Sequence, residues 1–404
     1  MTSRQKLLAR LAIPGSTKIV LLVLDGVGDL RSASQPKTAL DLARLPQFDA
    51  LARAGALGRL IPVAQGITPG SGPGHLALFG YDPTEPEADI GRGVLEALGD
   101  GLQIAPGDIA ARGNFATVDA AGRIVDRRAG RIPTAECERV VARLQPVLVD
   151  FPGVFVHAGE GHRFVVHVRG PGLSPALSDT DPQTVGVAPL PLVATGPAGE
   201  EAVRRLQPAL AAMSRAIADE PKANALLLRG FDGLPHLPQL PDLHRLRCGA
   251  FAGYPLYRGA AKACGMEIVP CGKPFGETVA AVRAAWDRFD LFFLHVKKTD
   301  AAGEDGDLAA KVSALEEVDS LLPELLALGP DVVAVTGDHS TPAPMKAHSW
   351  HPVPLLVSGP RVFMDETREF SEIAAIGGAI GTLPSSELLG LLLANAGRLA
   401  KYGA

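Results

Sequence analysis

Lys18-Ile-Val-Leu-Leu-Val-Leu-Asp-Gly26 is an unbroken aliphatic run that stops at an acid and a glycine. A run of this kind predicts a strand buried on both faces, as in a parallel sheet. Two later segments have the same form: 290–296 leads to Asp300, and 331–335 leads to Asp338-His339. Helical spacing is found between the strands and after them, at 37–55, 278–288, 308–328 and 385–396. This alternation predicts an α/β fold with a mostly parallel sheet that helices cover on both faces.

A second stretch, Gly66-Ile-Thr-Pro-Gly-Ser-Gly-Pro-Gly-His-Leu76, holds Ser71 among glycines and prolines. These residues mark positions where the backbone takes special dihedral angles or approaches a ligand closely. We expect a loop that exposes the Ser71 hydroxyl, followed by a helix beginning near His75 whose N–H groups point at an anion. A plain Gly-rich surface turn has the same composition, so this loop is not decisive by itself.

The middle of the chain has a different pattern of apolar and polar residues from the two ends, and it is expected to form a separate domain. We place a discontinuous core domain at residues 1–84 and 232–404, and an inserted, smaller α/β cap domain at residues 85–231. The Pro-rich segment 232–243 marks the return to the core. Arginines gather in the insert, although any single one fits an ordinary solvated surface equally well; they are Arg92, Arg112, Arg127, Arg128, Arg131, Arg163 and Arg229.

Composition limits the possible partners. The chain has 404 residues, 47% of them hydrophobic and 21% charged, as expected for a globular protein with a large core. A formal net charge of −5 gives no reason to expect nucleic acid or an anionic membrane as a partner. The four cysteines have no metal-binding spacing and no apolar run could span a bilayer, so we expect reduced thiols and a cytoplasmic protein. Whether the chain forms a homo-oligomer stays open.

Acidic and histidine side chains follow three of the buried strands. In an open parallel sheet, ligands bind outside the carboxyl ends of the strands, so Asp25, Asp300 and Asp338-His339 can converge there. His348 lies just before a further strand expected at 353–357. Two metal ions about 4 Å apart need carboxylates and imidazoles arranged in this way. Each residue alone fits a turn, a helix cap or a surface histidine, but together they favour a metal site.

With these motifs in place, the chain resembles the cofactor-independent phosphoglycerate mutases, in particular their archaeal-type branch within the alkaline phosphatase superfamily. The resemblance runs over nearly the whole chain and rests on an ordered set of motifs. They are Leu-Val-Leu-Asp-Gly at 22–26, Pro-Gly-Ser…Gly-His-Leu…Phe-Gly-Tyr-Asp-Pro at 69–83, Gly-Arg-Gly-Val-Leu-Glu-Ala-Leu-Gly at 91–99, Asn-Phe-Ala-Thr-Val-Asp at 114–119, Asp-Arg-Arg-Ala-Gly-Arg at 126–131, Ser-Asp-Thr-Asp-Pro at 178–182, His-Val-Lys-Lys-Thr-Asp at 295–300 and Thr-Gly-Asp-His-Ser-Thr-Pro at 336–342.

The resemblance implies an isomerase that interconverts 3- and 2-phosphoglycerate through a phosphoserine. It implies Ser71 as the nucleophile and two divalent metal ions. One ion would be bound by Asp25, Ser71, Asp338 and His339, and the other by Asp300 and His348. The substrate-binding residues that it implies are Arg92, Arg112, Arg128, Arg131, Arg163 and Lys297. Arginine binds phosphate and carboxylate groups bidentately, and closure of the insert over the substrate would exclude water.

The chain departs from the family pattern at two places. The family usually has a histidine four residues after the equivalent of Asp300, where this chain has Glu304. A carboxylate there makes the site harder, which favours Mn²⁺ or Mg²⁺ over Zn²⁺, with Co²⁺ also possible. Alternatively, Glu304 binds nothing, and His351 is a further, weaker candidate. The family's Ser-Asp-Thr at the nucleophile is replaced by Ser71-Gly72-Pro73.

Two other functions remain open from the sequence. A phosphohydrolase of the same superfamily would use the same serine and metal site but release phosphate to water. A non-catalytic phosphoglycerate-binding relative would explain Glu304 and the changed serine loop. The Arg-rich insert and its matched motifs favour the mutase over the phosphohydrolase.

Overall fold

The computed structural model describes residues 1–403, which form two compact units. The first unit combines residues 1–89 with the chain from Leu237 onward, and the second is Ile90–His236. The sequence placed the insert at 85–231, about five residues earlier at each end. Within residues 1–403, no helix combines the length and the apolar character needed to cross a membrane. The cysteines are free thiols, and Cys137, Cys248 and Cys264 are buried.

The first unit is built on an eight-stranded sheet with the order β13-β2-β12-β11-β1-β10-β8-β9. Strand β12 runs antiparallel to its neighbours β11 and β2, and the other pairs are parallel. The mostly parallel sheet predicted from the apolar runs is therefore confirmed. The strands are β1 (Ile19–Leu24), β2 (Gly55–Ile61), β8 (Cys248–Phe251), β9 (Glu267–Ile268), β10 (Leu291–Val296), β11 (Val332–Thr336), β12 (Val353–Ser358) and β13 (Gly381–Pro384).

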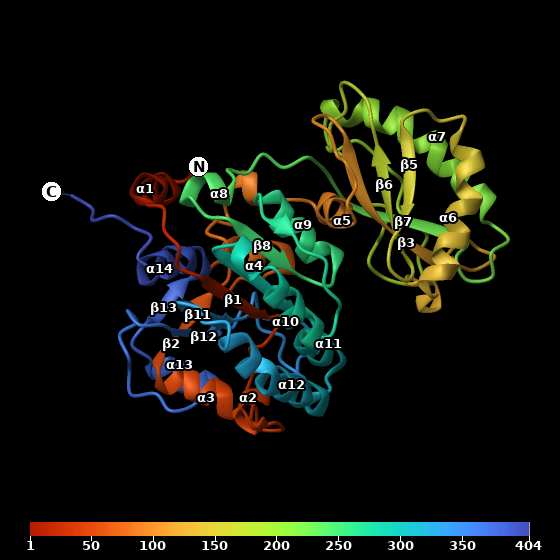
Figure 1. The fold of residues 1–404 in the computed structure, drawn as a ribbon. Helices are drawn as coiled ribbons and strands as arrows, with labels where there is room; N and C mark the ends of the chain where they lie inside the picture. Colours follow the sequence, from red (N-terminus) through yellow and green to blue (C-terminus); the bar gives the residue numbers. More distant parts are fainter. Residues whose placement is uncertain (404) are drawn as a thin grey trace. The chain divides into compact units, whose positions relative to one another are not determined.

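Helices cover both faces of this sheet, which is visible in the lower part of Figure 1. On one face, Val20, Leu22 and Leu24 of β1 share a buried core with α3, α10 and α12. On the other face, the ring of Phe293 packs against Phe79 at the end of α4, with 4.9 Å between ring centroids. The helices of this unit are α1 (Ser3–Leu11), α2 (Ala39–Leu42), α3 (Pro46–Arg53), α4 (Ser71–Leu78), α8 (Leu240–His244), α9 (Pro255–Ala263), α10 (Phe275–Ala284), α11 (Lys298–Asp305), α12 (Leu308–Leu326), α13 (Glu372–Gly377) and α14 (Leu388–Asn395).

The second unit is an antiparallel sheet with helices α6 and α7 packed on one face. Its strand order is β4-β3-β6-β5, and β7 also pairs with β3. The shorter helix α5 contacts β3 and β7. The elements are α5 (Arg92–Gly99), β3 (Ile109–Val118), β4 (Ile124–Asp126), α6 (Thr134–Leu148), β5 (Val154–Ala158), β6 (Arg163–Val168), α7 (Glu200–Ala216) and β7 (Ala225–Gly233).

Two sequence expectations about helices were wrong in detail. The helix expected over 37–55 is interrupted, because α2 ends before Arg44 and α3 begins at Pro46, whose fixed φ suits a first helical turn. The helix expected near His75 begins four residues earlier, at Ser71, with Gly70 as its N-cap. Pro73 is tolerated there because the first-turn N–H groups have no partner within the helix. Ser71 is therefore a helical residue and not a loop residue.

The core of the first unit supports a prediction on stability. Phe48 is fully buried and packs against Phe370, with ring centroids 5.6 Å apart. We expect Phe48→Ala to lower the free energy of unfolding of this unit by about 3–5 kcal/mol, because it removes buried area and leaves a cavity. Both tryptophans, Trp286 and Trp350, lie in the first unit, so tryptophan fluorescence during denaturant unfolding reports it specifically.

The control is Phe363→Ala, since Phe363 is 81% exposed. This variant should stay within about 0.5 kcal/mol of the parent protein. Equal losses in the two variants would contradict the packing described for Phe48.

Candidate active site

The acidic residues that follow the buried strands lie at one rim of the first unit's sheet. Asp25 comes directly after β1, Asp300 lies in the first turn of α11 after β10, and Asp338-His339 follow β11. Strand register brings these ends level: Leu24 is paired with Val296, and Val23 with Thr336. Positions separated by hundreds of residues in sequence thus become neighbours, because parallel strands present their carboxyl ends together.

The first cluster contains Asp25, Asp338 and His339, all fully buried, with potential ligand atoms within 4.8 Å of one another. His339 Nε2 lies 3.4 Å from Asp25 Oδ1 and 3.2 Å from Asp338 Oδ2. Neither of these two carboxylate oxygens has a hydrogen-bond partner. Buried oxygens without partners that face an imidazole nitrogen match the donor set of a divalent cation.

The second cluster contains Asp300, His339 and His348. His348 Nε2 lies 3.5 Å from Asp300 Oδ1, and the rings of His339 and His348 stack with centroids 3.7 Å apart. Glu304 lies at the edge, with its carboxylate 3.8 Å from His348 Nε2 and its side chain 56% exposed. The structure therefore adds His339 to a set that the sequence had assigned to Asp300, Glu304 and His348.

His351, the weaker candidate ligand, is in neither cluster. Its Nδ1 lies 2.9 Å from Ser349 Oγ, and its ring stacks on Trp350.

Ser71 stands at the first cluster. Its Oγ lies 3.2 Å from His339 Nε2, and it is the first residue of α4. This helix packs closely on the loop after β11: a Cβ on Gly74 would lie only 2.5 Å from the Asp338 carbonyl oxygen. Gly74 therefore has a concrete function, because the lack of a side chain lets the helix approach the loop that carries Asp338 and His339.

Lys297 compensates part of the negative charge. Its Nζ donates to Asp25 Oδ2 at 3.2 Å and to Asp300 Oδ2 at 2.5 Å. Burial opposes ionisation of Asp25, but Lys297 and the hydrogen bond from His295 outweigh it, so the pKa of Asp25 lies well below its usual value. Burial and the charge of Asp25 raise the pKa of Asp338. The nearby His339 and His75 lower it by more, so the pKa of Asp338 lies below its usual value. Both carboxyl groups are thus held as anions.

Sequence reasoning gave no role to two buried histidines of this site. His75 Nδ1 lies 2.8 Å from the Ser71 carbonyl oxygen and 3.2 Å from Asp338 Oδ2. His295 Nε2 lies 2.9 Å from Asp25 Oδ2, and its ring stacks on Tyr257 with centroids 3.6 Å apart. A polar residue inside the apolar run 290–296 was the available signal for His295, because such a residue needs a buried partner.

The second unit gathers several of the predicted arginines around Glu96. Arg92 Nε and Arg112 Nη1 lie 2.9 Å and 3.2 Å from Glu96 Oε1. Burial, only partly offset by Glu96, lowers the pKa of Arg112 well below its usual value, and repulsion from Arg92, Arg163 and Arg229 adds to this. The Nε atoms of Arg112, Arg163 and Arg229 are buried without hydrogen-bond partners. These Nε–H groups are donors without acceptors in a region of positive charge, and an anion could complete them.

Arg128 and Arg131 join this group near His162. Burial together with Arg163, Arg112, Arg128 and Arg131 lowers the pKa of His162 to about 4. Arg127 differs from the others, since it forms a two-point ion pair with Asp181, at 3.0 and 2.7 Å. It is therefore already neutralised within the unit.

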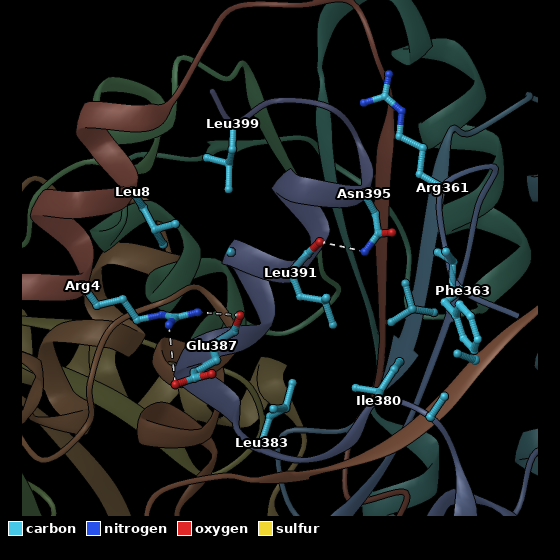
Figure 2. A pocket seen from close by; sticks show the side chains of 15 residues that line it. Arg4, Leu8, Arg361, Phe363, Ile380, Leu383, Glu387, Leu391, Asn395 and Leu399 are labelled. Carbon is cyan, nitrogen blue, oxygen red and sulfur yellow. Dashed lines mark hydrogen bonds and ion pairs between the residues drawn. The ribbon is translucent and has the colours of Figure 1, made fainter. Parts of the chain in front are cut away.

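A separate pocket of about 740 Å³ lies in the first unit (Figure 2). Helices α1 and α14 line it, together with residues of the segment 361–383. Its wall is mostly aliphatic, and Arg4 is paired with Glu387 across one side. The residues that line it include none of the predicted catalytic, metal or substrate-binding residues.

Comparison with known proteins identifies the family of the chain. A family model described as 2,3-bisphosphoglycerate-independent phosphoglycerate mutase matches residues 52–223. A protein of Thermus thermophilus named as a probable 2,3-bisphosphoglycerate-independent phosphoglycerate mutase is 49% identical over 402 residues, covering 98% of each chain. A protein of the same name from Thermotoga neapolitana is 45% identical over the full length of both chains.

Two solved structures are also similar to this chain. A cofactor-independent phosphoglycerate mutase from Thermoplasma acidophilum is 28% identical, with a TM-score of 0.66, covering 94% of this chain and all of the other. A Pyrococcus horikoshii protein superposes with a TM-score of 0.81 at 27% identity, covering 96% of this chain and all of the other. On the strength of the full-length relatives, the chain belongs to the family of 2,3-bisphosphoglycerate-independent phosphoglycerate mutases.

Proposed function

We propose that the protein interconverts 3-phosphoglycerate and 2-phosphoglycerate by passing the phosphoryl group through Ser71. The observation that carries this proposal is the position of Ser71 Oγ, 3.2 Å from His339 Nε2 at the edge of a buried acid–histidine cluster. Ser71 also begins helix α4, whose N-terminal N–H groups favour an anion beside them. Family membership supports the same reaction.

We propose further that two divalent ions act here, with Mn²⁺ preferred over Mg²⁺, Co²⁺ and Zn²⁺. Asp25, Asp338, His339 and Ser71 would hold one, and Asp300, His348 and Glu304 the other. The partnerless oxygens of Asp25 and Asp338 fit such an ion. When bound, the ions lower the pKa of the serine hydroxyl and offset charge on the phosphoryl oxygens.

The protein's own residues would then carry the reaction as follows. Ser71 Oγ would lose its proton and form a bond to phosphorus as the bond to the substrate oxygen breaks, and the freed glycerate oxygen would take up one proton in exchange. Glycerate would turn without leaving, and its other hydroxyl would lose its proton and attack the phosphoserine while Ser71 Oγ departs and regains a proton. Lys297 would contact the phosphoryl oxygens, because it is the cation beside both carboxylates.

The arginines of the second unit would bind the anionic groups of the substrate. We propose Arg92, Arg112, Arg128, Arg131 and Arg163 for this role. Support comes from the buried, unpaired Nε atoms of Arg112 and Arg163, which are costly unless an anion completes them. Water must be excluded from the phosphoserine during the turn of glycerate, because hydrolysis would convert the mutase into a phosphatase.

The reaction is tested by two assays on the same sample. 3-Phosphoglycerate with Mn²⁺, but without 2,3-bisphosphoglycerate, should give 2-phosphoglycerate in an enolase-coupled assay, with little phosphate released in parallel. Phosphate release that matches substrate loss would instead identify a phosphohydrolase. Substrate binding without isomer, phosphate or phosphoserine would identify a non-catalytic relative.

Replacement of the nucleophile should separate binding from chemistry. We expect Ser71→Ala to lower kcat by about 10⁴-fold or more, as for other nucleophile deletions, while phosphoglycerate still binds. Thr68→Ala is the control, since Thr68 is an exposed hydroxyl residue in the same stretch and should leave kcat unchanged. A fully active Ser71→Ala variant would refute the assignment of Ser71.

Metal binding can be measured without turnover. After removal of metal by a chelator, titration calorimetry with Mn²⁺ should show that Asp25→Asn weakens one binding event by at least about 100-fold, since loss of a direct ligand exceeds the 10–100-fold typical of outer contacts. Asp319→Asn is the control: Asp319 is also buried but accepts from the Gln47 and Phe48 N–H groups outside both clusters. Unchanged affinity in Asp25→Asn would contradict the first cluster as a metal site.

Replacement of one arginine of this cluster should affect substrate binding more than stability. We expect Arg112→Met to weaken phosphoglycerate binding by roughly 10–100-fold, from the loss of charge-assisted hydrogen bonds. The melting temperature should change little, because relief of the repulsion from Arg92, Arg163 and Arg229 offsets the loss of the buried ion pair with Glu96, which keeps Arg92 as a partner. Arg204→Met, at an arginine side chain 74% exposed in the same unit, is the control and should change neither quantity. A destabilised variant with normal binding would show a purely structural Arg112.

A further inference from the structure

A lysine lies fully buried next to the loops that carry the two candidate metal-binding clusters. Lys311 of α12 has no exposed surface, and its ammonium group donates to the carbonyl oxygens of Gly28, at 3.1 Å, and Thr341, at 2.9 Å. A buried charge is costly to desolvate, and the two carbonyl groups offset that cost together with the electrostatic attraction of Asp29, Glu372 and Asp300. Gly28 belongs to the loop after β1 and Thr341 to the loop after β11, so this one side chain ties together the two loops that carry Asp25 and Asp338-His339.

Thr341 is the centre of this arrangement. Its Oγ1 donates to Asp300 Oδ1 at 2.6 Å and lies 3.0 Å from His339 Nδ1. The hydroxyl has one proton, and the carboxylate can only accept it, so the second contact must be an N–H donated by His339 Nδ1. His339 Nε2 then carries the lone pair, and this is the nitrogen that faces Asp25 Oδ1, Asp338 Oδ2 and Ser71.

The surrounding backbone leaves no room for Thr341 to move. A Cβ on Gly26, whose φ is +63°, would lie 2.4 Å from Thr341 Oγ1. A Cβ on Gly303 of α11 would lie 2.3 Å from the Thr341 carbonyl oxygen, the same oxygen that Lys311 contacts. The threonine is therefore enclosed by the loop after β1, by α11 and by Lys311.

We propose that Lys311 and Thr341 are positioning residues that act as one unit, here called the Lys311–Thr341 brace. Lys311 fixes the backbone of Thr341, and the Thr341 hydroxyl orients Asp300 and sets the His339 tautomer that leaves Nε2 free to bind a cation. The brace thereby links Asp300 of the second candidate cluster to His339 of the first. Such outer contacts typically change metal affinity by 10–100-fold. This inference rests on the metal site of the proposed function.

The test replaces only the hydroxyl of Thr341. Thr341→Val keeps the backbone carbonyl that Lys311 contacts, and we expect it to weaken Mn²⁺ binding by about 10–100-fold in titration calorimetry. Thr341→Ser restores a hydroxyl and should recover affinity to within about threefold of the parent. The matched control is Thr336→Val, because Thr336 is equally buried on β11 but donates to the Pro354 carbonyl. It should bind Mn²⁺ as the parent does.

A second readout needs no metal. In ¹⁵N-histidine NMR spectra of the metal-free protein, His339 should be the Nδ1–H tautomer in the parent and in Thr341→Ser, and should lose that preference in Thr341→Val. Lys311→Met should weaken Mn²⁺ binding as Thr341→Val does. Its control is Arg398→Met, since Arg398 is also a buried cation but contacts Thr17 before β1, at the opposite end of the strand. That variant is expected to lose stability without losing metal affinity.

The outcomes separate the brace from the proposed function. Normal Mn²⁺ affinity and an unchanged His339 tautomer in Thr341→Val would overturn the brace, even if the parent protein is an active mutase. Failure of the parent to bind Mn²⁺ or to isomerise phosphoglycerate would count against the proposed function, while the tautomer measurement would still decide whether Thr341 orients His339. If Lys311→Met does not fold, the Thr341 variants decide alone.

Discussion

Three carboxylates that are buried within reach of one histidine dominate this structure. Asp25, Asp300 and Asp338 have no exposed surface, and His339 lies against all of them. A buried anion left without a partner costs roughly 3–5 kcal/mol, so such a cluster persists only with positive charge nearby. Lys297 supplies part of that charge, and the partnerless oxygens of Asp25 and Asp338 indicate that more is needed. The fold of the first unit serves to hold these like charges together.

The parallel sheet makes this crowding possible. Adjacent parallel strands end at the same rim, so β1, β10 and β11 deliver their acids to one place without long loops. The hydrophobic faces of the strands, packed under helices on both sides, supply the stability against which the charge repulsion is tolerated. Helix α4 then adds Ser71, and it can approach because Gly74 has no side chain to meet Asp338.

The second unit shows the opposite electrostatic character. Its arginines crowd around Glu96 and His162, and several of their donors are buried without partners. Donors left unsatisfied in this way reduce stability, which is typical of residues kept for binding. The buried anionic groups with their histidines are thus concentrated in the first unit, and the crowded cationic groups lie in the second.

Much of this followed from the sequence alone. Buried strands are long aliphatic runs, and the acids after them are adjacent in sequence to the strands they follow, so the parallel sheet and the cluster of Asp25, Asp300, Asp338 and His339 could be predicted. Local pattern was also enough for α10, α12 and α14. The start of α4 at Ser71 could not be predicted, because glycine and proline weaken a helix in isolation and this one is stabilised by packing against the loop after β11.

The contacts of Lys311 could not be predicted either. A lysine in an amphipathic helix is expected to be solvated, and its partners here are the backbone carbonyl groups of Gly28 and Thr341, which any residue type would supply. Sequence thus determined which residues could do chemistry and which strands would carry them, whereas tertiary structure decided their mutual distances, protonation and orientation, because those depend on contacts between segments that only folding brings together.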